Sequence, residues 1–155
     1  MRGKVFEYAR RITFAETDGA GIAHFSRFSR WVEEAETAFW RVHGVEVPFV
    51  EEGRLFGFPK VSFSIRYRAP VRCGEEIGVE IEPQVLGAGR ITWGFRVKRG
   101  EVICAAGKMV VVFAQAEPLR GGLMTHEMPE KMLRVLGGVP MEGERVAKNE
   151  EEEEG

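Results

Sequence analysis

Cysteine is scarce in this sequence, which has only Cys73 and Cys104 among its 155 residues. Two cysteines give neither a disulfide framework nor the paired spacing of a metal-ligand site. Cys104 lies in an apolar run, so we expect it to be a small residue of the hydrophobic core. These observations argue against a disulfide-stabilised scaffold, and we expect neither a bound metal nor a cofactor.

Long hydrophobic runs are also missing. The most apolar stretch, MVVVFA at residues 109–114, is far shorter than the ~20 residues that a membrane-spanning helix needs. The first residues, MRGKVFEYARR, lack the apolar segment of a signal peptide. We therefore predict a cytoplasmic protein that has no membrane partner.

The net charge of -2 is small, and its distribution is uneven. Five of the 24 acidic residues form the run Glu150–Glu154, so without this run the 22 basic residues outnumber the acidic ones. A mildly basic body suits a small anionic ligand better than a long nucleic acid. We therefore expect no nucleic-acid partner.

The length is that of one domain with a sizeable core. We assign residues 1–140 to this single domain. Residues 141–155 form an acidic tail whose end, NEEEEEG, has no apolar residue to bury. The tail is therefore predicted to be disordered.

One long amphipathic helix is predicted between Ser26 and about His43. Ser26 is a suitable N-cap and Gly44 a suitable C-terminal stop. The apolar side chains of this segment recur at the spacing of one helix face over four turns, and they are Phe28, Trp31, Val32, Ala35, Ala38, Phe39 and Val42.

The rest of the chain is dominated by strand patterns. Apolar and polar residues alternate with the period of two that one buried sheet face requires, and the turns LGAG (86–89) and KRGE (98–101) lie at hairpin spacing. We predict strands at residues 5–14, 61–67, around 79–82, 91–97 and 102–114, the last in the interior of the sheet, and a short terminal helix at 129–136.

A strand, a long helix and then four strands make an α+β pattern. An antiparallel sheet with one apolar face must cover that face. The helix at residues 26–43 is the only large cover available. The simplest architecture is a curved antiparallel sheet wrapped around one central helix.

The acidic loop between the first strand and this helix contains Asp18, followed by Gly19-Ala20-Gly21. The two glycines resemble part of a dinucleotide-binding fingerprint, but His24 stands where the third glycine belongs, and we discard that interpretation. Asp18 can be simply a turn residue. It can also be a functional carboxylate, because it precedes a helix N-terminus with free N–H groups.

The segment RITFAETDGAGIAHFSRFSRWVEEAETAF, residues 11–39, closely resembles the start of hot-dog-fold thioesterases of the 4-hydroxybenzoyl-CoA thioesterase type. The likeness rests on an Asp, a Gly three residues later, an Ile and an aromatic-rich helix start. It continues through GFPKVSFSIRYRAPVRCGEEIGVEIE and MVVVFA. The resemblance implies a hot-dog fold and an acyl-CoA thioesterase.

The resemblance also implies roles for individual residues. Asp18 would attack the thioester carbonyl or activate a water, and the backbone N–H of Phe25 would hold the oxyanion. The substrate would be a CoA thioester, and the protein a homo-oligomer, either a dimer or a dimer of dimers, with sites at the interface. The implied substrate-binding residues are Gly21, Ile22, His24, Phe28 and Arg90.

Some residues depart from the family pattern. Relatives often have Tyr-His or Trp-Tyr where this chain has His24-Phe25, and a run of basic residues where only Arg90 remains. Basic side chains elsewhere can compensate, namely Arg66, Arg68, Arg72, Lys98 and Arg99. Each of these is most simply a solvated side chain on a strand face or loop.

Three alternatives remain open from the sequence. Glu33, Glu34 and Glu36 are most simply the polar face of the helix, but another branch of the fold has its carboxylate on this helix. Glu33 or Glu34 is therefore the second choice of site. A non-catalytic acyl-binding or oligomerisation module is the rival function, and a dehydratase is a weaker third.

Overall fold

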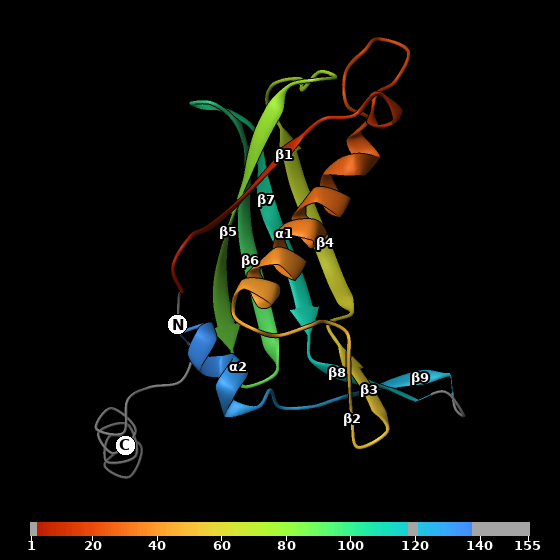
Figure 1. The fold of residues 1–155 in the computed structure, drawn as a ribbon, viewed down its shortest axis with the longest axis vertical. Coiled ribbons are helices and arrows are strands. Elements are labelled where there is room, and N and C mark those ends of the chain that lie inside the picture. The colour runs from red at the N-terminus through yellow and green to blue at the C-terminus, as the bar shows by residue number, and fades with distance from the viewer. Residues whose placement is uncertain (1–2, 118–120, 138–155) are drawn as a thin grey trace.

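The computed structural model describes residues 3–117 and 121–137, and the predicted acidic tail lies outside them. A five-stranded antiparallel sheet wraps around one long helix (Figure 1). Its strand order is β1-β5-β6-β7-β4, in which β1 is Phe6–Arg11, β4 is Lys60–Tyr67, β5 is Glu76–Leu86, β6 is Arg90–Arg99 and β7 is Val102–Val112.

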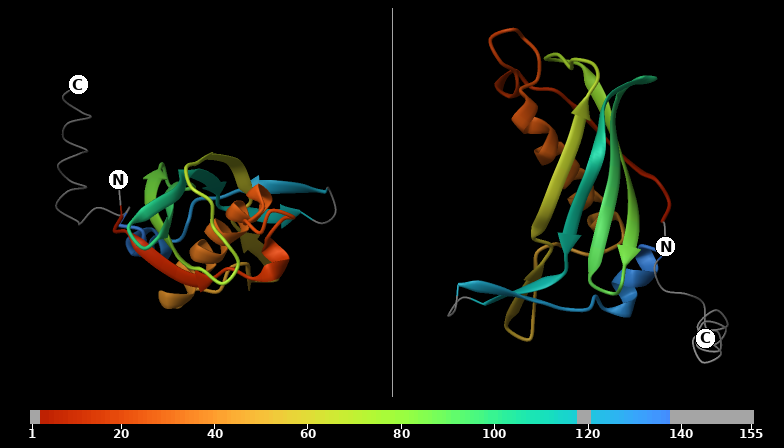
Figure 2. Two further views of the ribbon diagram at one scale, coloured as in Figure 1. Left: turned by 90° about the horizontal axis from the view of Figure 1, so that it is seen from above. Right: turned by 180° about the vertical axis from the view of Figure 1, so that it is seen from behind.

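Helix α1, Phe28–Val42, lies on the concave face of this sheet (Figures 1 and 2). Residues that face the helix alternate along the strands, as Ile91, Trp93, Phe95 and Val97 do on β6, and all four are buried. The predicted architecture, a curved antiparallel sheet around a central helix, is therefore correct. β7 lies inside the sheet as expected, although β6 occupies its centre.

The buried face of α1 differs from the predicted one. Trp40 and Glu36 are fully buried, whereas Val42 is 71% exposed. The stripe follows the same helical periodicity but continues through Trp40, whose ring stacks on Phe58 at 5.2 Å. The buried residues of the helix are Phe28, Trp31, Val32, Ala35, Glu36, Phe39 and Trp40.

A second, smaller sheet was not predicted. Its order is β2-β3-β8-β9, in which β2 is Phe49–Glu51, β3 is Arg54–Gly57, β8 is Ala114–Glu117 and β9 is Gly122–Thr125. It projects from the end of the main sheet where β4 begins (Figure 2). The predicted strand at 102–114 is therefore divided at Phe113, because the chain leaves the main sheet there.

The remaining elements agree closely with the sequence patterns. α2, Glu130–Val135, is the predicted terminal helix. Gly44 ends the central helix region with a positive φ of 79°, which favours glycine. Within the described residues, no helix is both long and apolar enough to cross a membrane.

Candidate active site

Asp18 lies in a loop that folds back on itself between β1 and α1. The Asp18 N–H donates to the Ile22 carbonyl at 2.9 Å, and Thr17 and Ala23 form a β-bridge. The Gly21 N–H donates to the Asp18 carbonyl at 3.0 Å, and Gly21 takes a φ of 76° that side chains disfavour. These bonds give the exposed loop a defined backbone.

The carboxylate of Asp18 has one occupied and one free oxygen. Oδ1 accepts the Ala20 N–H at 2.8 Å, which is the bond of an Asx turn. Oδ2 has no hydrogen-bond donor among the residues that the structure describes. Asp18 is therefore a turn residue that also presents an exposed, unoccupied carboxylate oxygen. The two interpretations of this residue are compatible.

The helix N-terminus begins with a short 3-10 turn, Phe25–Arg27, that leads into α1. His24 is its N-cap, because the His24 Nδ1 accepts the Ser26 N–H at 3.3 Å. The prediction that Ser26 is the cap was wrong, since the 3-10 turn moves the start of the helix towards the loop. The Phe25 N–H has no acceptor within the described part of the chain. It is available to a ligand.

The surroundings of this free N–H are aromatic. Phe14 is 82% exposed and Phe25 is 65% exposed, so one chain leaves a large apolar surface here. Phe28 is buried and packs edge-on against Tyr67 with ring centroids 5.1 Å apart. The Tyr67 hydroxyl donates to the Phe25 carbonyl at 3.1 Å. The last residue of strand β4 is thus hydrogen-bonded to the 3-10 turn.

A loop carboxylate seven residues before a free N–H at the start of a helix is the arrangement that the family resemblance implied. The family model of the thioesterase superfamily matches residues 20–106, more than half of the chain. The chain belongs to the thioesterase superfamily. The family predicted from the sequence is therefore confirmed, and its thioester chemistry agrees with the predicted class of enzyme.

Two curated relatives are similar in sequence. A 1,4-dihydroxy-2-naphthoyl-CoA hydrolase from Prochlorococcus marinus is 28% identical over 99 residues, which are 59% of this chain and 66% of that enzyme. An enzyme of the same name from Thermosynechococcus vestitus is 33% identical over 86 residues, 54% of this chain and 58% of that one. The aligned segments thus span no more than about two thirds of these enzymes.

Solved structures confirm the fold. A 1,4-dihydroxy-2-naphthoyl-CoA thioesterase from Synechocystis superposes with a TM-score of 0.76 at 23% identity, over 88% of this chain and 98% of that one. A hypothetical protein from Thermus thermophilus superposes with a TM-score of 0.74 at 25% identity, over 90% of this chain and all of that one. The predicted hot-dog fold of this superfamily member is correct.

Arg90 does not lie near Asp18 within one chain. It pairs with Val112 at the end of the sheet where β6 begins, whereas Tyr67, which contacts the Phe25 turn, pairs with Ala105. Val112 and Ala105 are seven residues apart on β7, which corresponds to roughly 23 Å at about 3.3 Å per residue. A single chain of this superfamily member therefore places its predicted CoA contact at the far end of the sheet.

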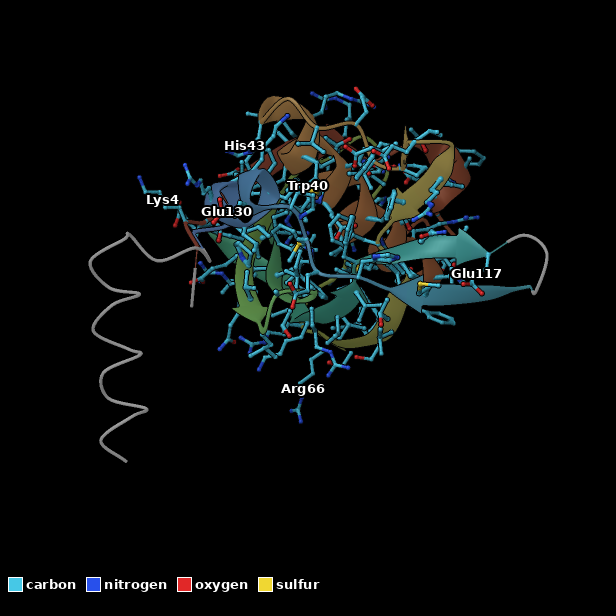
Figure 3. All side chains as sticks on the ribbon, turned by 90° about the horizontal axis from the view of Figure 1, so that it is seen from below. Lys4, Trp40, His43, Arg66, Glu117 and Glu130 are labelled. Atoms are coloured by element: carbon cyan, nitrogen blue, oxygen red, sulfur yellow. The ribbon has the colours of Figure 1, made fainter. Side chains whose placement is uncertain are left out.

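Of the five other basic candidates, exposed Arg72 forms a β-bridge with Ile22 of the Asp18 loop, and the remaining four divide into two groups. Lys98 and Arg99 are engaged, because Lys98 pairs with Glu80 at 3.1 Å and Arg99 with Glu75 at 3.2 Å. Arg66 and Arg68 are exposed and line a cavity of about 670 Å³ on the outer face of the sheet. Arg66 points away from the body of the protein (Figure 3).

The helix carboxylates are largely committed to other partners. Glu34 accepts Arg10 at 2.9 Å and the Tyr8 hydroxyl at 3.2 Å. Glu36 is buried and pairs with Lys60 at 2.7 Å, so its assignment to the polar face was wrong. Only Glu33 remains on the exposed face. Of the two second-choice carboxylates, Glu34 is thus engaged, whereas Glu33 has no ion pair or side-chain hydrogen bond among the described residues.

Sequence reasoning overlooked Glu16, which precedes Asp18 by two residues. Its side chain is 12% exposed and accepts hydrogen bonds from β1, from its own loop and from α1. Thr13-Phe14-Ala15-Glu16 has the spacing of a capping box, and this signal indicated that Glu16 bonds back to the Thr13 N–H. Nothing in the sequence indicated its distant partners.

Proposed function

We propose that this superfamily member hydrolyses an acyl-CoA thioester to a carboxylate and free CoA. The observation that carries the proposal is the presence of two unoccupied groups in the segment that joins β1 to α1. One is the free carboxylate oxygen of Asp18, and the other is the free N–H of Phe25 at the start of the helix region. The names of the curated relatives support a CoA thioester as the substrate.

The Phe25 N–H supplies electrostatic stabilisation in the proposed reaction. When a nucleophile adds to the thioester carbonyl, the oxygen becomes an anion. A backbone N–H at a helix N-terminus stabilises this charge. Loss of one such donor costs roughly 10² to 10³ in rate in other enzymes, so this group accounts for a large share of the catalysis.

Asp18 can act in either of two ways. As a base, it takes a proton from water while the oxygen of that water bonds to the carbonyl carbon. As a nucleophile, its oxygen bonds to that carbon, and water then hydrolyses the resulting anhydride. In both routes the carbon–sulfur bond breaks and CoA leaves as a thiolate, which is protonated afterwards.

We further propose that two chains share each site. β4 is an edge strand, hydrogen-bonded within the main sheet only to β7, and its Tyr67 contacts the Phe25 turn. Pairing β4 with its copy across a two-fold axis covers the open edge and adds a wall beside the exposed Phe25. Because the pairing is antiparallel, it brings the Arg90 end of one sheet towards the Asp18 end of the other.

The aromatic surroundings favour an apolar acyl group. Phe14 and Phe25 offer exposed rings beside the proposed site, which suits an aromatic or bulky aliphatic acyl chain. Arg90 of the neighbouring copy, and Arg66 and Arg68 on the outer face, are the cations available for the CoA phosphates. His24, Gly21 and Ile22 form the adjacent wall of the loop.

A thiol-release assay over aromatic and aliphatic acyl-CoAs tests the proposed activity. We expect turnover on at least one class, with the aromatic substrates preferred. Absence of thiol release from every substrate, with acyl-CoA binding retained, would instead support the acyl-binding module. Light scattering at micromolar concentration tests the shared site, which an active monomer of 17.4 kDa would refute.

A further inference from the structure

Glu16 receives more hydrogen bonds than any other carboxylate discussed above. Its Oε1 accepts Arg10 Nη2 at 2.6 Å and both the N–H and the hydroxyl of Thr13 at 2.9 Å. Its Oε2 accepts the Trp31 indole N–H at 2.6 Å. The three donor residues come from β1, from the segment after β1 and from α1. One side chain thus joins three segments around the loop.

The backbone of Glu16 contacts the segment that leads into the Phe25 turn. The Glu16 carbonyl accepts the His24 N–H at 2.9 Å, and His24 is the residue directly before Phe25. On the other side, Thr17 and then Asp18 follow Glu16 in the chain. A shift of Glu16 therefore moves both the carboxylate of Asp18 and the N–H of Phe25.

We propose that Glu16 is a positioning residue, which holds the Asp18 loop and the Phe25 turn in the relative geometry that thioester hydrolysis needs. This inference rests on the proposed function, since it presupposes that Asp18 and Phe25 do the chemistry. Misplacement of reacting groups by about 1 Å can cost 10²-fold in rate, so a fixed loop has a kinetic consequence.

Glu16 is not itself placed to act as the base. Both of its oxygens are occupied by donors. Burial raises the pKa of Glu16, but the hydrogen bonds from Thr13 and Trp31 and the charge of Arg10 outweigh burial and hold the pKa below its usual value. The residue is therefore a stable anion at neutral pH. Its contribution is to orient other groups.

Glu16→Gln is the direct test, because the amide keeps the shape but presents an NH2 group to donors. We expect kcat for the best acyl-CoA substrate to fall by about 10- to 100-fold, with KM changed less than about 3-fold. Hydrogen exchange of residues 13–24 should accelerate. A purely structural role would not move kcat per folded molecule.

Glu80→Gln is the matched control. The Glu80 side chain is 13% exposed, pairs with Arg96 at 2.7 Å and Lys98 at 3.1 Å, and also has a lowered pKa, against the effect of burial, because of these two cations. It lies on β5, away from the loop, and lines the same cavity as Arg66 and Arg68, so the comparison rests on kcat and loop exchange and not on KM. We expect the control to keep the wild-type kcat and loop exchange. Equal losses in both variants would overturn the proposal.

Asp18→Asn, measured in parallel, separates this proposal from the proposed function. If Asp18→Asn is inactive and Glu16→Gln keeps its kcat, the role of Glu16 is refuted while the function stands. If Asp18→Asn is active, the assignment of the site fails, and the role of Glu16 fails with it.

A milder variant covers the case in which Glu16→Gln does not fold. Thr13→Val removes only the exposed hydroxyl bond to Glu16. It should lower kcat by roughly 2- to 5-fold, less than Glu16→Gln, because this bond to the Glu16 carboxylate is exposed and the other three hydrogen bonds to Glu16 remain. An unchanged kcat in that variant would overturn the proposal.

Discussion

The two ends of the main sheet each enclose a carboxylate, but in different surroundings. At the loop end, Glu16 accepts four hydrogen bonds, and the neighbouring surface carries exposed aromatic rings and unoccupied polar groups. Near the other end, Glu36 pairs with Lys60 at 2.7 Å, and its buried Oε2 has no close hydrogen bond, although the Trp93 indole also lowers its pKa. Aromatic rings pack closely around that end.

The pKa values of the two carboxylates shift in opposite directions. Burial raises the pKa of Glu36, and the charge of Lys60 offsets this only in part. Hydrogen bonds and Arg10 lower the pKa of Glu16 despite its burial. At the loop end, the charged carboxylate of Glu16 is therefore held in one position by its hydrogen bonds. The end of the sheet near Glu36 is instead stabilised by packing. Substitutions at the loop end should alter activity, and substitutions at the end near Glu36 should alter stability.

The largest expected effect is on stability, from Lys60→Met. It leaves the buried Glu36 without its partner, and we expect the free energy of unfolding to fall by about 3 kcal/mol at pH 7.5. A raised carboxyl pKa favours the fold below the unfolded pKa, and this stability is lost as pH rises through the folded pKa. The deficit should therefore be smaller at pH 5, as urea unfolding at both pH values would show.

The matched control for this variant is Lys60→Met combined with Glu36→Gln. Removing the unpaired charge should restore part of the lost stability and abolish the difference between the two pH values. A deficit in Lys60→Met that does not depend on pH would contradict the assignment of Glu36 as the titrating group.

A smaller loss of stability is expected from Phe113→Leu. The Phe113 ring contacts Phe49, Phe56 and Phe58 at centroid distances of 5.4 to 6.1 Å. Losing these contacts should cost about 2 kcal/mol of unfolding free energy. The kcat of the folded protein should not change, because these rings join the small sheet to the main sheet. A fall in kcat beyond about 3-fold would show that the two ends are coupled.

Much of this fold could be predicted from the sequence because the main elements have long periodic patterns. The central helix and the strands β4 to β7 each repeat their pattern over many residues. The small sheet was missed because β2 has three residues and β3 has four, too few for a period to show. The sequence did contain a signal, because Glu52-Gly53 lies between the apolar pairs Phe49-Val50 and Leu55-Phe56. In the structure both residues take a positive φ and form the turn between β2 and β3.

The site residues could be predicted only where local sequence carries the pattern. The candidates Asp18, Gly21 and Phe25 lie within eight residues of one another and were predicted from the motif. The roles of Glu16 and Glu36 depend on partners such as Trp31 and Lys60, 15 and 24 residues away. Such pairings form only when the helix packs on the sheet. Sequence spacing alone did not indicate them.

A smaller effect, on activity alone, should come from Tyr67→Phe at the loop end. It removes the 3.1 Å hydrogen bond to the Phe25 carbonyl and so loosens the turn that presents the N–H. We expect kcat to fall roughly 5-fold, the equivalent of about 1 kcal/mol, with little change in Tm. Tyr8→Phe is the control, because within the described part of the chain the Tyr8 hydroxyl bonds to Glu34 at 3.2 Å and not to the Phe25 turn. A similar fall in both variants would argue against a specific role for Tyr67.

The rate of thiol release by Asp18→Asn tests the catalytic role of the loop most directly. The asparagine oxygen can still accept the Ala20 N–H, so the turn should persist, and circular dichroism and Tm should match the wild type. We predict a loss of about 10² or more in kcat, as expected when a base or nucleophile is removed. A folded variant that retains more than about a tenth of the wild-type rate would contradict the assignment of Asp18 as the catalytic carboxylate.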